Sequence, residues 1–231
     1  MPAAGNAARS RQFFDQFARD WNGFYASSGR MEPRIRRFLT AVQPLVPSGG
    51  RILDFGCGTG NLTQALHKAG FNASGADLSA GMIASAQTNY PGESSRFLVL
   101  QEDGSIPLPA SSLQAITASS VLEYVPRIER TLAEFARTLS PGGVTIVTVP
   151  TVTHRVRRIE ALAQSTLSLF RVARFANHLP WALRRRIEYL TISVNRYPIA
   201  RWHSLFAAAG FSPLHVEGEH TTLVLLAYRK S

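Results

Sequence analysis

The sequence has little cysteine and no long hydrophobic run. The one cysteine, Cys57, excludes an internal disulfide and a cysteine-based metal cluster. No run reaches the roughly 18 apolar residues that a transmembrane helix needs, and residues 1–10 lack the apolar segment of a secretory signal. These absences favour a cytoplasmic protein. Because no group of histidine, cysteine and aspartate residues has metal-ligand spacing, we also expect no metal site.

Lysine is scarce as well. Only Lys68 and Lys230 occur, so arginine carries most of the formal net charge of +10. Between residues 151 and 201, ten arginines stand against two acids, which gives this segment a charge of +8. Such a segment favours an anionic partner, either an acidic substrate, a lipid headgroup or a nucleic acid. The alternative is a solvated helix face that is rich in arginine because the genome favours arginine codons.

Short apolar runs alternate with segments whose apolar residues recur at helical spacing. Gly29 divides the helical segment 9–42, and residues 140–143 read as a turn. Strands are expected at 51–55, 72–76, 96–100, 113–119, 144–149, 211–216 and 221–228, and further helices at 61–69, 79–89, 127–139 and 199–209. This order predicts one α/β domain, residues 1–231, with a doubly wound, mostly parallel, Rossmann-like sheet of seven strands. The last two strands are joined by too few residues for a crossover helix, so we expect them to pair antiparallel.

A glycine-rich turn follows the first expected strand, in the stretch LDFGCGTG at residues 53–60. Gly56, Gly58 and Gly60 let the backbone approach a ligand closely. Their spacing is not the G-x-G-x-x-G of dinucleotide enzymes, and Asp54 would repel a pyrophosphate. The turn therefore suits a positively charged nucleoside without phosphates.

A second acid, Asp77, ends the second expected strand, 21 residues after Gly56. An acid at this distance, at the tip of the second strand, can accept hydrogen bonds from both ribose hydroxyls. Dinucleotide enzymes share this feature, so Asp77 predicts a ribose but does not by itself identify the cofactor.

The stretch 53–60 resembles the first motif of the class I S-adenosylmethionine-dependent methyltransferases. Three later stretches are similar to further motifs of that family, each at the end of an expected strand or in the turn that leads into one. They read EDGSIPLP at 102–109, SSVLEYV at 119–125 and LSPGGV at 139–144. The resemblance covers residues 51–149, with a weaker similarity at 200–229. Four motifs in the right order rarely agree with one fold by accident.

The resemblance implies S-adenosylmethionine as the cofactor and a set of residues that bind it. Asp103 is expected to contact the adenine amino group, and Ser119 to face the methionine part. The full expected set is Asp54, Gly56, Cys57, Gly58, Gly60, Asp77, Leu78, Asp103, Gly104 and Ser119.

A hydroxyl acceptor would need a general base beside it. His154 follows the fifth expected strand, at the sheet edge where ligands bind, and is the first candidate. Tyr124 stands where the family often has histidine, which puts a catalytic imidazole there in doubt, and Glu123 is a further candidate. Tyr124 and His154 are the expected catalytic residues.

Residues outside the shared core are expected to determine the acceptor. They are a helical lid at 1–45, with an aromatic run at 13–25, and a helical insertion at 151–197. The insertion carries an apolar stripe among arginines, which is typical of a lid helix or of a helix that lies on an anionic membrane surface.

The expected function is methyl transfer to a small molecule, at an oxygen of a lipophilic or anionic metabolite. The alternative is an RNA-modifying methyltransferase that uses the basic segment. It is disfavoured because residues 119–122 read SSVL, and not the Asn/Asp-Pro-Pro-aromatic motif of many nucleic-acid amino methyltransferases. A cofactor-binding scaffold without catalysis also fits the motifs, whereas the glycine spacing and Asp54 disfavour an NAD enzyme.

Overall fold

The computed structural model describes residues 3–18, 20–21, 23, 29–152, 181–219 and 221–231. These residues contain a seven-stranded sheet in the order β3-β2-β1-β4-β5-β7-β6. The strands are β1 (Arg51–Phe55), β2 (Asn72–Asp77), β3 (Phe97–Val99), β4 (Leu113–Ser119), β5 (Leu139–Pro150), β6 (Phe211–Glu217) and β7 (Leu223–Lys230). β1 to β5 pair in parallel, and β7 lies antiparallel between β5 and β6. The predicted fold class and the antiparallel final pair are confirmed.

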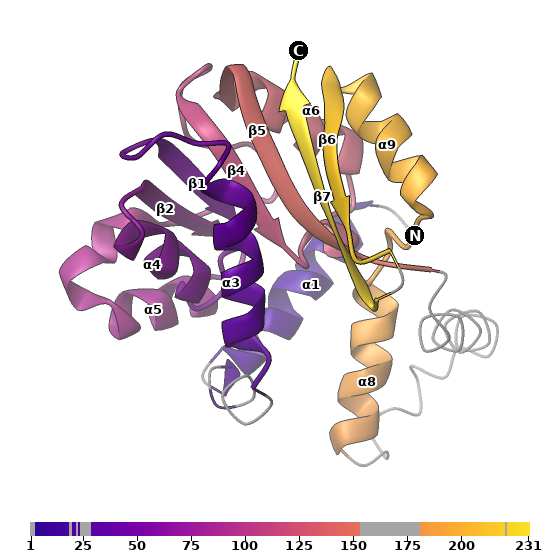
Figure 1. Cartoon of the computed structure of the whole chain (residues 1–231). Coiled ribbons are helices and arrows are strands. Elements are labelled where there is room, and N and C mark those ends of the chain that lie inside the picture. The colour runs from indigo at the N-terminus through magenta and orange to yellow at the C-terminus, as the bar shows by residue number, and fades with distance from the viewer. Residues whose placement is uncertain (1–2, 19, 22, 24–28, 153–180, 220) are drawn as a thin grey trace.

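Helices cover both faces of the sheet (Figure 1). One face carries α3 (Met31–Val42), α4 (Asn61–Lys68) and α5 (Ala80–Asn89), and the other carries α6 (Ile128–Thr138) and α9 (Ile199–Ala208). Successive residues of a strand point to opposite faces. Accordingly, Ile52 packs in a cluster with Phe38 of α3, whereas Leu53 packs in a cluster with Phe135 of α6. Burial on both faces explains why the central strands are apolar along their length.

Three further helices lie around the edge at which β1 and β4 end. They are α1 (Ala3–Phe17), the short helix η2 (Leu122–Tyr124) and α8 (Trp181–Ile192). The short helix η1 (Pro91–Arg96) lies at the opposite edge, where it leads into β3 and Arg96 bonds to Asn72 at the start of β2. α1 contacts α5, η2 and α8. In a sheet of this order the strands after β1 are added first on one side of it and then, from β4 on, on the other side. Ligands bind in the crevice outside the carboxyl ends of β1 and β4, where this switch occurs.

Two sequence expectations change in detail. Residues 140–143 do not form a separate turn, because β5 already begins at Leu139. Its pairing with β4 instead shifts register between Leu113 and Ala115, which face Leu139 and Val144. The glycines of this stretch permit the irregularity, since Gly142 has a φ of +73°. Of the expected insertion, residues 153–180 lie outside the described residues. No helix in the described part of the chain is long and apolar enough to span a membrane.

Candidate active site

The glycine-rich turn folds back against the tip of β2. The backbone N–H groups of Gly56 and Cys57 both donate to the carbonyl of Ala76, at 2.7 and 3.1 Å. Gly56 has a φ of +72°, and a Cβ there would lie 2.2 Å from a methyl group of Val121. Only glycine therefore fits position 56, for reasons of both conformation and space. The turn leaves its backbone exposed to the crevice, as the sequence predicted.

Asp77 joins the turn to the next helix. Its Oδ2 accepts a hydrogen bond from the N–H of Gly58 at 2.9 Å, and its Oδ1 accepts one from the N–H of Ser79 at 2.9 Å. Burial raises the pKa of Asp77 although these backbone bonds lower it, and the charge of Asp15 adds to the increase. Each carboxylate oxygen can accept a second hydrogen bond. Asp77 can therefore still receive two hydroxyl groups from a ligand.

Asp54 lies deeper than its sequence position suggested. The side chain is 1% exposed, and its two oxygens accept hydrogen bonds from Thr63 Oγ1 at 2.8 Å and from Thr117 Oγ1 at 3.0 Å. Burial raises the pKa of Asp54 to about 6, although both threonines oppose the shift, and the charge of Asp77 contributes. Asp54 nevertheless lines the cavity described next, so it places negative charge beneath the turn.

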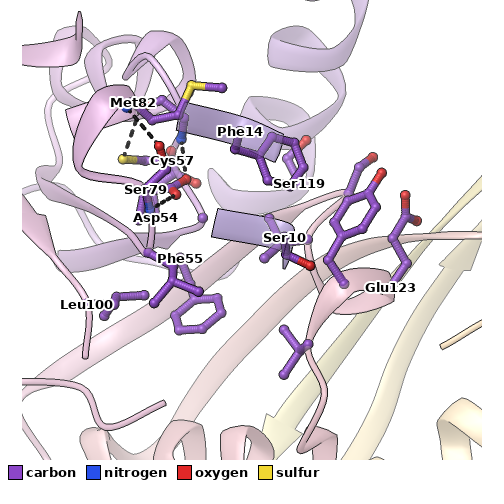
Figure 2. A pocket seen from close by; sticks show the side chains of 18 of the residues that line it. Ser10, Phe14, Asp54, Phe55, Cys57, Ser79, Met82, Leu100, Ser119 and Glu123 are labelled. Carbon is purple, nitrogen blue, oxygen red and sulfur yellow. Dashed lines mark hydrogen bonds between the residues drawn. The ribbon is translucent and has the colours of Figure 1, made fainter. Parts of the chain in front are cut away.

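A cavity of about 990 Å³ opens at this edge of the sheet. Its first half is lined by most of the expected cofactor-binding residues. They are Asp54, Gly56, Cys57, Gly58, Asp77, Leu78, Gly104 and Ser119. Figure 2 shows Asp54, Cys57 and Ser119 of this set. The hydroxyl oxygen of Ser119 is buried, and no partner for it is found among the described residues. The buried hydroxyl of Ser10 in α1 likewise has no partner among the described residues, and Ser10 is 5% exposed. Since a buried polar group without a partner is costly, both hydroxyls fit a ligand that hydrogen-bonds to them.

Two of the expected residues do not line this cavity. Gly60 instead begins α4, with a φ of +84°. Asp103 is exposed, and its carboxylate accepts hydrogen bonds from the N–H and hydroxyl of Ser105 and from Arg130 at 2.9 Å. These hydrogen bonds lower the pKa of Asp103. The neighbouring residues Glu102 and Gly104 line the cavity in its place.

The N-terminal helix covers the cavity from above the turn. Arg11 forms an ion pair with Glu102. One turn further along α1, Asp15 accepts hydrogen bonds from the Ser79 hydroxyl at 2.5 Å and from the N–H of Gly81 at 3.0 Å. α1 is therefore attached to the rest of the domain at two points beside the first half of the cavity. The sequence predicted an aromatic cover here, but it did not predict these polar attachments.

The second half of the cavity is aromatic. Phe13, Phe14, Trp21, Tyr124 and Tyr189 line it. Their rings are in contact, with centroids 5.3 Å apart for Phe14 and Tyr124 and 6.0 Å apart for Tyr124 and Tyr189. The expected aromatic residues at positions 24 and 25 lie outside the described residues. The wall is thus built from α1, the segment after it, η2 and α8.

A buried carboxylate belongs to this aromatic half. Glu123 is 1% exposed, lines the cavity and accepts a hydrogen bond from the Tyr189 hydroxyl at 3.4 Å. Burial and the nearby Glu123 raise the pKa of Tyr124 well above its usual value. Tyr124 is therefore protonated at neutral pH, so it can donate a hydrogen bond but is poorly suited to accept a proton. The other expected catalytic residue, His154, lies outside the described residues.

Asn195, which the sequence analysis did not single out, holds the segment that carries these side chains. Its Nδ2 donates to the carbonyls of Leu122 at 2.8 Å and Val125 at 2.6 Å, and its N–H donates to the carbonyl of Glu123 at 3.0 Å. Its Oδ1 accepts a hydrogen bond from the Tyr197 hydroxyl at 3.0 Å. Nothing local marks this asparagine, because the carbonyls to which its side chain donates lie 70 or more residues away.

Comparisons with known proteins agree with this geometry. Residues 27–216 match a family described as a methyltransferase domain. Over 177 residues the chain is 32% identical to trans-aconitate 2-methyltransferase of Methylobacterium nodulans, covering 70% of this chain and 67% of the relative. It is 29% identical over 161 residues to the ubiquinone biosynthesis O-methyltransferase of Xanthomonas oryzae pv. oryzae, and the match spans 62% of the length of that relative and 62% of this chain.

The fold has solved counterparts too. A SAM-dependent methyltransferase from Thermotoga maritima superposes with a TM-score of 0.65 at 18% identity, covering 96% of this chain and 99% of the other. At this identity the likeness concerns the fold alone. The family match extends over most of the chain and includes the glycine turn, Asp77 and the β4 tip. The chain therefore belongs to the class I S-adenosylmethionine-dependent methyltransferase family.

Proposed function

We propose that the protein transfers a methyl group from S-adenosylmethionine to an oxygen atom of a small lipophilic or anionic molecule. The observation that carries this proposal is the continuity of the cavity. The same space of about 990 Å³ borders the glycine turn and the aromatic wall. Ligand cavities usually measure about 300–1,000 Å³, so this cavity has room for an acceptor beside the cofactor.

The residues of the first half fit the cofactor. Asp77 would accept the ribose hydroxyls, and Leu78 and Gly104 would border the adenine. The backbone of the glycine turn and Ser119 would hold the methionine part, whose ammonium group suits the negative charge of Asp54. When bound, the cofactor supplies a methyl group on a positively charged sulfur. Asp103 stays a prediction from the family pattern, since its carboxylate is held by Ser105 and Arg130.

The second half fits an acceptor with an apolar or aromatic body. Because the methyl group departs from a good leaving group, its transfer to the acceptor depends largely on positioning, which a wall of packed rings provides. Tyr124 would donate a hydrogen bond to the acceptor. The proton of a hydroxyl acceptor would pass to His154, as the sequence predicts, or to Glu123, whose carboxylate lines the cavity. α1 would exclude water from the reaction.

The test measures turnover. Purified protein is incubated with S-adenosylmethionine and a panel of phenolic, quinol and carboxylic-acid acceptors. S-adenosylhomocysteine formation and a product mass increase of one methylene group are followed. Gly58→Val provides the control for cofactor dependence, because a side chain at its φ of +55° strains the turn, and the new Cβ would lie 3.8 Å from Trp21 Nε1 without a clash. Binding of S-adenosylhomocysteine without turnover on any acceptor would contradict the proposal and favour a cofactor-binding scaffold.

An RNA-modifying function is the second candidate, because the segment 151–201 carries a charge of +8. RNA binding through arginines would weaken steeply with salt. Methylation of RNA in preference to every small acceptor would favour this second function.

A further inference from the structure

Two arginines at the N-terminal end of α3 line the same cavity. Arg30, which precedes α3, and Arg34, one turn further along, both line the cavity together with Met31. Thr222 and Leu223 at the start of β7 also line it, and the carbonyl of Leu223 accepts a hydrogen bond from Arg37, one turn beyond Arg34. Positive charge is thus placed near the β7 side of the cavity, whereas Asp77 ends β2, which β1, β4 and β5 separate from β7.

The neighbouring arginines of α3 have a different role. Arg36 pairs with Glu32 at 3.7 Å, and both side chains are largely exposed. Arg37 pairs with Glu217 at 2.8 Å and donates to the carbonyls of Glu217 and Leu223. Arg36 therefore forms an ion pair on the surface, and Arg37 connects α3 to the end of β6 and the start of β7. Arg30 and Arg34 differ from them because they face the cavity.

Among the described residues, each of the four acids that line the cavity has a contact of its own. Glu102 pairs with Arg11, Asp54 is held by two threonines, and Asp77 is held by two backbone N–H groups. Glu123 is bonded to Tyr189 in the aromatic wall. The net charge of +10 also favours the approach of an anion.

We propose that Arg30 and Arg34 bind a carboxylate group of the methyl acceptor, while the aromatic wall holds the body of that molecule. Guanidinium groups bind carboxylates through paired, charge-assisted hydrogen bonds. The acceptor class is therefore a hydroxylated or polybasic carboxylic acid of small size. This inference rests on the proposed function, and it adds the charge of the acceptor and the residues that recognise it.

The experiment compares two probes of nearly equal shape, 3,4-dihydroxybenzoate and the neutral 3,4-dihydroxybenzamide. Calorimetry measures the binding of each to protein saturated with S-adenosylhomocysteine, and turnover assays measure KM and kcat. We expect the benzoate to bind at least tenfold more tightly to the unaltered protein. Arg34→Gln and Arg30→Gln should each remove most of this preference through KM and leave the affinity for S-adenosylhomocysteine unchanged.

Arg36→Gln is the matched control, because it removes the same charge from the same helix on the side away from the cavity. It should keep the tenfold preference. Arg34→Lys keeps the charge but loses the planar fork, and an intermediate preference is expected. If Arg34→Gln does not fold, the exposed Arg30→Gln carries the test.

Equal affinity for the two probes in the unaltered protein, including no binding of either, would overturn the proposal. So would an equal effect of Arg36→Gln, or an anion preference confined to an RNA oligonucleotide. Failure of the proposed function is distinguishable. It would appear as absent methyl transfer to both probes while the benzoate preference at Arg30 and Arg34 persists.

Discussion

The carboxylate of Asp77 accepts a hydrogen bond from the backbone N–H of Gly58 at 2.9 Å. This bond joins the tip of β2 to the glycine turn after β1, although the two residues are 19 positions apart. The turn and the acid for which we propose ribose binding are therefore linked before any ligand arrives. Preorganisation of this kind reduces the entropy that binding must offset.

Replacing Asp77 should weaken cofactor binding strongly. Asp77→Ala removes the acceptor of the Gly58 and Ser79 bonds, so we expect at least a tenfold loss of S-adenosylhomocysteine affinity in calorimetry. Asp103→Ala is the comparison. Because its carboxylate is exposed and bonded to Ser105 and Arg130, we expect a change of less than threefold. Equal losses in both variants would instead support the adenine contact that the sequence predicts for Asp103.

Position 56 should reject any side chain. In Gly56→Ala, the new Cβ would lie 2.2 Å from Val121, and the backbone would have to keep a φ of +72°. We expect a loss of unfolding free energy of about 2–4 kcal/mol, which combines backbone strain and overpacking. Urea denaturation measures it.

Two variants separate the contributions at Gly56. Gly142→Ala has nearly the same φ, +73°, and nothing within 4 Å of its Cβ, so it should show the strain alone, about 1–2 kcal/mol. Adding Val121→Ala to Gly56→Ala should relieve most of the clash, since it removes both methyl groups and leaves the Cβ of residue 121 at 2.9 Å. A Gly142→Ala variant as unstable as Gly56→Ala would show that the clash is unimportant.

The buried Asp54 should make stability depend on pH. Its pKa rises from 3.8 to about 6 on folding. Between these values the folded protein binds more protons than the unfolded chain, so this group lowers stability as the pH rises through that window. In Asp54→Asn this contribution is absent. The variant should therefore gain about 2–3 kcal/mol of unfolding free energy relative to the unaltered protein between pH 4 and pH 7.

Denaturation curves at several pH values test this expectation. Asp77 titrates in both proteins, so the difference between their profiles reports Asp54 together with its charge interaction with Asp77. Parallel stability profiles for the two proteins would be incompatible with a raised pKa at Asp54.

Asn195 should act as a positioning residue for the acceptor wall. Asn195→Ala leaves the carbonyls of Leu122 and Val125 without their buried donor, and the residue is 4% exposed. We expect a loss of about 2–4 kcal/mol of stability. Because η2 carries Glu123 and Tyr124, kcat/KM for the acceptor should fall at least tenfold while S-adenosylhomocysteine affinity changes little.

Tyr197→Phe is the control for Asn195, since it removes only the hydroxyl that donates to Oδ1. It should keep the donors to Leu122 and Val125 and most of the turnover. A purely structural role would be indicated if Asn195→Ala, assayed well below its melting temperature, kept full kcat/KM.

The sequence by itself determined the seven strands, the mostly parallel sheet and the antiparallel pairing of the last two strands. Alternating strands and helices restrict the topology, and the glycines at 56, 58 and 60 need only their local backbone to form the turn. Asp77 could be placed because a parallel strand brings its own tip to the same sheet edge. The 140–143 stretch was misread because a strand irregularity and a turn use the same residues.

The tertiary structure alone decided what covers and completes the cavity. The ion pair of Arg11 with Glu102 joins residues 91 positions apart, and the bond between Asp15 and Ser79 joins residues 64 positions apart. The carboxylate of Asp103 accepts a hydrogen bond from Arg130, which lies on α6, 27 residues further along the chain. Such pairings depend on how whole helices dock. Local periodicity gives the apolar face of a helix, but it does not tell which polar group that helix will meet on a distant segment.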